Sequence, residues 1–125
     1  MPNHPTRDDA LALLHEYTKS DSLRRHALGV EQAMLKMAEK YGGDLNEWGI
    51  AGLLHDFDYE MYPTMEEHPY KGNEILKDKG YPESICKAIM GHATYTGIPR
   101  DTDMAKALFS VDELTGFIFA VTYVR

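Results

Sequence analysis

The sequence contains little cysteine, no long apolar run and no cluster of basic residues, and each absence excludes a class of function. Its single cysteine, Cys86, cannot form an internal disulfide, which favours a reducing compartment. No apolar run approaches the roughly 18 residues that cross a bilayer, and residues 1–9 lack the apolar segment of a secretory signal. We therefore expect a cytoplasmic protein with no membrane partner.

The charge balance argues against a nucleic-acid polymer as a partner. The formal net charge is −7, and the 13 lysines and arginines are scattered along the chain. Release of counterions by clustered basic side chains drives most non-specific binding to DNA and RNA, so this protein gains little from it. A small anionic substrate stays compatible with an acidic chain, because bound metal ions reverse the local field.

Apolar residues recur at helical spacing almost throughout the chain, and no strand pattern competes with them. Capping residues, glycines and prolines divide the pattern into six expected helices, over residues 8–18, 21–41, 44–55, 68–80, 82–92 and from 102 onward. The length of 125 residues fits one domain. The predicted fold class is all-α, a compact bundle of about five to six helices.

Histidines and one aspartate interrupt the apolar faces of these helices. They lie on the faces that we expect to point into the core, and they are His26, His55, His68, His92 and Asp112. A single histidine on an apolar face is more often a hydrogen-bonded core residue than a ligand, and a buried aspartate is often paired. The inward faces of a bundle converge, however, and several imidazoles and carboxylates crowded together are best satisfied by divalent metal ions.

The adjacent pair His55-Asp56 is the sharpest local feature. It follows the apolar segment 49–54, in which Gly49 and Gly52 would let this helix pack closely against a neighbour. Near a helix end, two adjacent side chains can approach one ion from two sides, and an aspartate can bridge two ions through its two oxygens. A His-Asp dipeptide occurs often by chance, so its value lies in its position after the buried segment.

The ordered set of His26, the pair His55-Asp56 and the distant Asp112 resembles the metal-ligand pattern of the HD-domain superfamily of metal-dependent phosphohydrolases. The segment GLLHDFDYE, residues 52–60, is similar to the His-Asp motif of that family. The resemblance covers about residues 20–120, and it implies a single α-helical HD-like domain within 1–125. It also implies hydrolysis of a phosphate ester, often in a nucleotide, by a metal-activated water.

Two further histidines resemble those of the two-metal, HDIG-like subset: His68 in EEHPYKGNEIL and His92 in AIMGHATYTG. The resemblance implies one or two divalent ions of Fe, Mn, Mg, Ni, Co or Zn. By motif matching, the first ion would be held by His26, His55, Asp56 and Asp112. His68 and His92 would hold the second ion, with Asp56 as the bridge.

The resemblance also suggests roles around the ions. Asp56 and Asp58 are the expected catalytic carboxylates, and Asp58 or Glu60 would orient water or a ligating histidine. A small phosphorylated or nucleotide substrate would be contacted by cations and by one aromatic residue, namely Arg25, Lys71, Arg100 and Tyr95. For each of these residues, the alternative is an ordinary solvent-exposed position with no role in the site.

Two features depart from the family pattern. Asp58 stands where two-metal relatives sometimes carry a lysine. The sequence also ends soon after the Asp112 helix, where related domains usually continue, and residues 116–124 are very apolar. We expect this segment to be covered by a second copy of the chain in a homo-oligomer.

Two alternatives to hydrolysis remain at this stage. Some HD-like proteins use a di-iron centre with nearly the same ligands to activate oxygen, and iron content with oxygen consumption would distinguish them. The other alternative is a truncated, non-catalytic module that binds metal or nucleotide. The intact set of six ligands argues against such a decayed site.

Overall fold

The computed structural model describes the backbone of residues 5–124 and the side chains of residues 5–114, and this part of the chain contains helices without strands. The elements are α1 (Arg7–Tyr17), α2 (Asp21–Tyr41), α3 (Leu45–Leu54), α4 (Tyr70–Asp78), α5 (Glu83–Gly91), the short 3-10 helix η1 (Thr94–Thr96) and α6 (Asp103–Val124). The expected all-α bundle is confirmed. The single turn η1 lies in a segment that the sequence pattern left as a loop.

Side chains and glycine set the start of α1, the end of α2 and the start of α3. Thr6 and Asp9 form a reciprocal capping box at the start of α1, and the side chain of Asp44 accepts a hydrogen bond from the Glu47 N–H at the start of α3. Gly42 ends α2 with a φ of 73°, a left-handed conformation that costs glycine little. The sharp turn that follows sends α3 back along α2.

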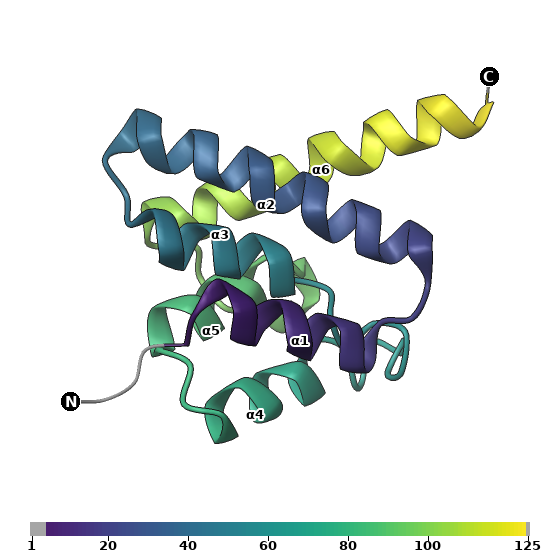
Figure 1. The fold of residues 1–125 in the computed structure, drawn as a ribbon, viewed down its shortest axis with the longest axis horizontal. Helices are drawn as coiled ribbons and strands as arrows, with labels where there is room; N and C mark the ends of the chain where they lie inside the picture. The colour runs from purple at the N-terminus through teal and green to yellow at the C-terminus, as the bar shows by residue number, and fades with distance from the viewer. Residues whose placement is uncertain (1–4, 125) are drawn as a thin grey trace.

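The close approach of α2 and α3 depends on Gly52. A Cβ at this position would lie 2.9 Å from Met34 Cγ and 3.0 Å from the Val30 carbonyl oxygen. Figure 1 shows α3 running beneath α2, with α6 crossing behind both helices and with α1 and α4 on the other side of the bundle. The residue three positions after Gly52, His55, is thereby brought near α2.

Helix α3 passes through the core, since every residue from Trp48 to Leu54 is buried. Neighbouring helices cover it on several sides, with α2, α1 and α5 making the most contacts. The chain therefore delivers His55 into the interior at the point where α3 ends, and Asp56 follows it as a partly buried side chain. Burial of the preceding apolar residues supplies the stabilisation that places two polar side chains there.

The last helix leaves the bundle. In Figure 1 the C-terminal half of α6 diverges from α2 and projects beyond the other helices. The expectation that a second copy covers residues 116–124 concerns side chains that lie outside the described part of the chain. Among the described residues, no helix is both long and apolar enough to cross a membrane.

Candidate metal centre

Five segments of the chain meet at one cluster of imidazoles and carboxylates. Helix α2 contributes one histidine, the end of α3 and its following turn contribute the His-Asp pair, and the segments at the start of α4, the end of α5 and the middle of α6 contribute one residue each. The cluster consists of His26, His55, Asp56, His68, His92 and Asp112. All six residues that the sequence predicted as ligands are therefore brought together.

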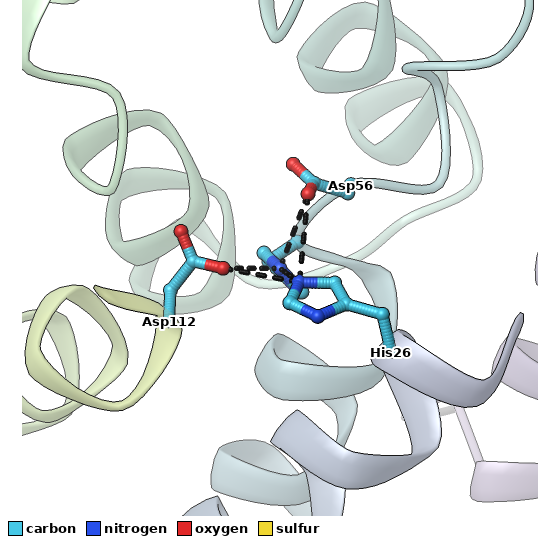
Figure 2. A group of neighbouring side chains, drawn as sticks. His26, Asp56 and Asp112 are labelled. Carbon is cyan, nitrogen blue, oxygen red and sulfur yellow. Dashed lines mark hydrogen bonds and ion pairs between the residues drawn. The ribbon is translucent and has the colours of Figure 1, made fainter. Parts of the chain in front are cut away.

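The first group of donors contains four of these residues. Asp112 Oδ1 lies 3.2 Å from His26 Nε2 and 2.9 Å from His55 Nε2, and the two Nε2 atoms are 3.1 Å apart. Asp56 Oδ2 lies 3.3 Å from His55 Nε2 and 3.9 Å from His26 Nε2. Figure 2 shows His26 of α2, Asp112 of α6 and Asp56 of the turn after α3 approaching this point from different directions.

The second group shares Asp56 with the first. Asp56 Oδ1 lies 3.2 Å from His68 Nε2 and 3.1 Å from His92 Nε2. The two oxygens of one carboxylate thus face two separate sets of imidazole nitrogens. Within each group, one donor atom from every residue lies within 4.8 Å of the others.

The backbone fixes the orientation of two imidazoles. His55 Nδ1 donates a hydrogen bond to the Gly52 carbonyl at 2.7 Å, and His92 Nδ1 donates to the Ile89 carbonyl. In both cases the acceptor is three residues earlier, where the helix ends and its last carbonyls need partners. Because a carbonyl can only accept, Nδ1 carries a proton in both rings, and Nε2 is the nitrogen available to a ligand.

His68 is oriented by a carboxylate instead. Asp58 Oδ1 accepts a hydrogen bond of 2.7 Å from His68 Nδ1, and Asp58 Oδ2 accepts one of 2.9 Å from the Gly72 N–H. Asp58 is completely buried. It lies behind the imidazole, away from the shared donor atoms of Asp56. This contact agrees with the sequence prediction that Asp58 orients a ligating histidine, and its predicted catalytic role stays a prediction.

Glu60, the alternative to Asp58 in the sequence prediction, lies elsewhere. Its carboxylate accepts hydrogen bonds from the backbone N–H groups of Lys19 and Ser20, at 2.9 to 3.2 Å. It therefore ties the turn after α3 to the link between α1 and α2. The prediction that it orients a ligand is not met by this geometry.

Charge within the cluster shifts its pKa values strongly. Burial alone would lower the pKa of His55, but Asp56 and Asp112 outweigh it and raise that pKa well above its usual value. The same balance raises the pKa of His68 to about 9, through Asp56 and Asp58. Burial would raise the pKa of both Asp56 and Asp112, yet the neighbouring imidazoles hold each well below its usual value.

These shifts describe a site that demands positive charge. Two ionised carboxylates lie among four imidazoles, and the raised pKa values of His55 and His68 favour protons on these two rings in the metal-free protein. In His55, His68 and His92, Nδ1 already donates to an acceptor and Nε2 faces the cluster. A cation bound to Nε2 can therefore take the place of a proton there while the Nδ1 hydrogen bond is kept. Nitrogen and oxygen donors in this proportion fit a divalent first-row metal, and the residues present therefore fit such an ion.

A cleft of about 420 Å³ opens onto the cluster. His68, His92 and Asp112 line its floor, and Tyr59 and Tyr95 belong to its walls. Its volume lies within the range of about 300–1,000 Å³ that is usual for small-molecule sites. The predicted substrate contact Tyr95 thus lines the cleft beside three residues of the cluster.

The three cations predicted to contact substrate lie elsewhere. None of them is among the described residues that line the cleft, and Arg25 and Lys71 are exposed on α2 and α4. Arg100 is committed to structure, since its Nη1 donates to the Gly91 carbonyl at 2.7 Å and its guanidinium lies 4.1 Å from the Phe109 ring centre. Their roles as substrate contacts stay predictions, and a basic residue near a ligand in sequence need not face the cleft.

Sequence reasoning missed several cleft residues. Tyr59, Phe109 and Glu113 line the cleft beside the predicted ligands. Two signals were present: Phe109 precedes Asp112 by three residues on one helix face, and Tyr59 follows the His-Asp pair closely. Glu113 gave no signal, because exposed acids are common on helices.

Comparisons with known proteins agree with this geometry. A curated relative, "Bis(5'-nucleosyl)-tetraphosphatase, symmetrical" of Staphylococcus aureus (strain NCTC 8325 / PS 47), is 35% identical over 74 residues, which is 54% of this chain and 38% of the relative. The match thus spans well under half of that relative's length. No solved structure gives a significant match. The family model of the HD domain matches residues 23–115, a range that holds all six clustered residues, and the chain belongs to the HD domain family.

Proposed function

We propose that this protein hydrolyses a phosphate ester of a nucleotide or a similar small metabolite with the help of one or two divalent cations. The observation that carries the proposal is the position of Asp56, whose two oxygens face separate groups of imidazole nitrogens. A carboxylate shared in this way suits paired ions, which in two-metal hydrolytic sites lie about 3.5–4 Å apart. The family supports the reaction class, and the tetraphosphatase relative supports a nucleotide substrate.

In this proposal the six clustered residues are the ligands. The first group would hold one ion and the second group the other, with Asp56 between them. A divalent cation bound there would supply Lewis acidity to a water molecule and to the phosphoryl oxygens. The protein supplies the orientation of the donors, because buried hydrogen bonds lock His55, His68 and His92 before any ion arrives.

The cleft sets the side from which a substrate would approach the cluster. His68, His92 and Asp112 line the cleft, so a phosphate would reach the cluster from solvent through it. His55, by contrast, is fully buried beneath the cluster. Substrate and water therefore enter on the side of Tyr95, and the core closes the opposite side.

The test compares metal dependence with a ligand variant. Protein stripped by a chelator should release no phosphate from p-nitrophenyl phosphate or from a panel of nucleotides, and added Mn²⁺, Fe²⁺, Co²⁺ or Ni²⁺ should restore release. Asp56→Asn should lower kcat/KM by more than about a hundredfold, since even partners of metal ligands cost up to that factor. Asp78→Asn, on an exposed residue at the end of α4, is the matched control.

Three results would contradict the proposal. Phosphate release that survives both the chelator and Asp56→Asn would remove the cluster from the reaction. Oxygen consumption by the iron-loaded protein without any phosphate release would indicate the di-iron alternative. Tight nucleotide binding without turnover under every metal would indicate the non-catalytic module.

A further inference from the structure

We propose that the cleft selects phosphate esters whose leaving group carries an aromatic ring and no further charge, and that Glu113 discriminates against substrates carrying further phosphates. The inference deepens the proposed function and rests on it for the position of the reacting phosphate. It concerns the walls of the cleft, which consist of residues outside the ligand cluster.

Aromatic side chains form the walls next to the cluster. Tyr59 is 43% exposed and Tyr95 is 41% exposed, and both line the cleft together with Phe109. Exposed aromatic rings around a polar floor are an arrangement that favours stacking of a planar ring. These residues come from the turn after α3, from η1 and from α6, so the walls surround the opening.

Two of the rings are held in place by one ligand residue. The Tyr59 ring packs edge-on against the His68 ring at 5.5 Å between centres, and the Tyr95 hydroxyl donates to the His68 carbonyl oxygen at 2.5 Å. A ring fixed in this way loses little entropy when a ligand stacks on it. The walls are therefore preorganised relative to the donors of the second group.

The charge of the cleft points to one phosphate. Among the described residues no lysine or arginine lines it, and Glu113 is an exposed acid on its wall. The nearby Arg100 does not compensate, because its guanidinium is bonded to the Gly91 carbonyl and lies against the Phe109 ring. Further phosphates of a longer chain would thus lie in a cleft with an acid and without a balancing cation.

The ligand cluster explains why one phosphate is still accepted. Its two carboxylates, Asp56 and Asp112, do not neutralise two divalent cations, so bound ions retain positive charge for a phosphate placed directly on them. That attraction falls off with distance and is screened by salt. A terminal group that is aromatic and uncharged gains stacking energy from the rings of the walls and is not repelled by Glu113.

Binding separates this inference from catalysis. The probes are the non-hydrolysable methylenephosphonate analogues of adenosine monophosphate and adenosine triphosphate, titrated calorimetrically into the Mn²⁺-loaded protein. We expect the monophosphate analogue to bind at least about fivefold more tightly, and Glu113→Lys to shift the ratio by about tenfold toward the triphosphate analogue. Glu39→Lys, on an exposed residue of α2 away from the cleft, makes the same charge change and should leave the ratio unaltered.

The walls are tested with a second pair of probes. Tyr59→Ala should lower the affinity for the monophosphate analogue by about tenfold, within the range measured for base stacking on aromatic side chains. It should leave the affinity for inorganic phosphate unchanged. Tyr41→Ala, on an exposed tyrosine at the end of α2 that does not line the cleft, should bind both probes as the unaltered protein does. Equal weakening of both probes by Tyr59→Ala would overturn the stacking role.

The outcomes for selectivity and for catalysis are distinguishable. Tighter binding of the triphosphate analogue by the unaltered protein, or an unchanged ratio in Glu113→Lys, would overturn the inference. Phosphate release from nucleotides without the predicted preference would contradict the selectivity alone. The predicted binding preference in a protein that hydrolyses nothing would contradict the proposed hydrolysis and leave the cleft's selectivity standing.

Discussion

Asp58 joins His68 to the first turn of α4, with 2.7 Å from its Oδ1 to His68 Nδ1 and 2.9 Å from its Oδ2 to the Gly72 nitrogen. The other two buried imidazoles use backbone carbonyls for the same purpose. Replacing a carbonyl by a carboxylate makes the imidazole a more basic ligand. The second group of donors therefore depends on one side chain that the first group lacks.

Asp58→Asn should selectively weaken metal binding by the second group of donors. An asparagine offers one acceptor and one NH₂ donor where two N–H groups need acceptors, so either His68 or the Gly72 N–H loses its partner. We expect metal affinity at one of two sites to fall about 10–100-fold. Mn²⁺ titration followed by elemental analysis measures it, with Asp78→Asn as the control. Unchanged occupancy at both sites would contradict the positioning role.

Gly72→Ala should destabilise the protein. The added Cβ would lie 2.8 Å from Asp58 Cγ and 3.0 Å from Phe57 Cε1, both in buried side chains. Overpacking of this kind typically costs about 1–3 kcal/mol. The free energy of unfolding in urea measures it, and Glu74→Ala, on an exposed residue of the same helix, should change it by less than about 0.5 kcal/mol. Equal effects of the two variants would contradict the close fit.

Arg7→Ala should also lower the free energy of unfolding. Glu31 is almost fully buried in α2, and Arg7 reaches it from α1 with Nε 2.5 Å from Oε2 and Nη2 3.0 Å from Oε1. Removing the arginine leaves a buried carboxylate without this partner, at a cost of about 3 kcal/mol. Lys36→Ala, on an exposed residue of α2, is the control in the same urea titration. A loss in Arg7→Ala no larger than the control's would contradict the role of this pair.

The metal-free protein should lose stability as pH rises from about 6.5 to 9. Asp56 and Asp58, acting against burial, raise the pKa of His68 from 6.5 to about 9 in the folded chain. A raised pKa means that the folded state holds the proton more tightly, so its contribution is complete below 6.5 and is lost as pH passes 9. Urea unfolding in a chelator at several pH values measures it, and His68→Gln should flatten the trend. Stability that rises over this interval would contradict the assignment.

Much of the fold followed from the sequence, because the helices carry their own boundaries. The apolar spacing, the cap at Asp44 and the glycine at Gly42 act within a few residues, and they predicted α2 and α3 closely. The cluster of six predicted ligands followed from a different argument, since inward faces of a bundle must converge. The first argument uses information that is local in the chain, and the second needs only the expectation that the helices pack around one core.

The remaining features depend on contacts between distant segments. Asp58 contacts both His68 and Gly72 because the turn after α3 meets the start of α4. The Arg100 guanidinium donates a hydrogen bond to the Gly91 carbonyl at the end of α5 and does not line the cleft. Spacing along the chain does not encode such contacts, so the sequence named six residues that do come together and did not show which cations line the cleft.

The central claim is that Asp56 shares its two oxygens between two cation sites. Anomalous diffraction from crystals of the Mn²⁺-loaded protein tests it most directly. We predict two peaks about 3.5–4 Å apart, one beside His26, His55 and Asp112 and the other beside His68 and His92, with the Asp56 carboxylate between them. Absence of manganese from this cluster, or a single peak that the Asp56 carboxylate does not touch, would contradict the account.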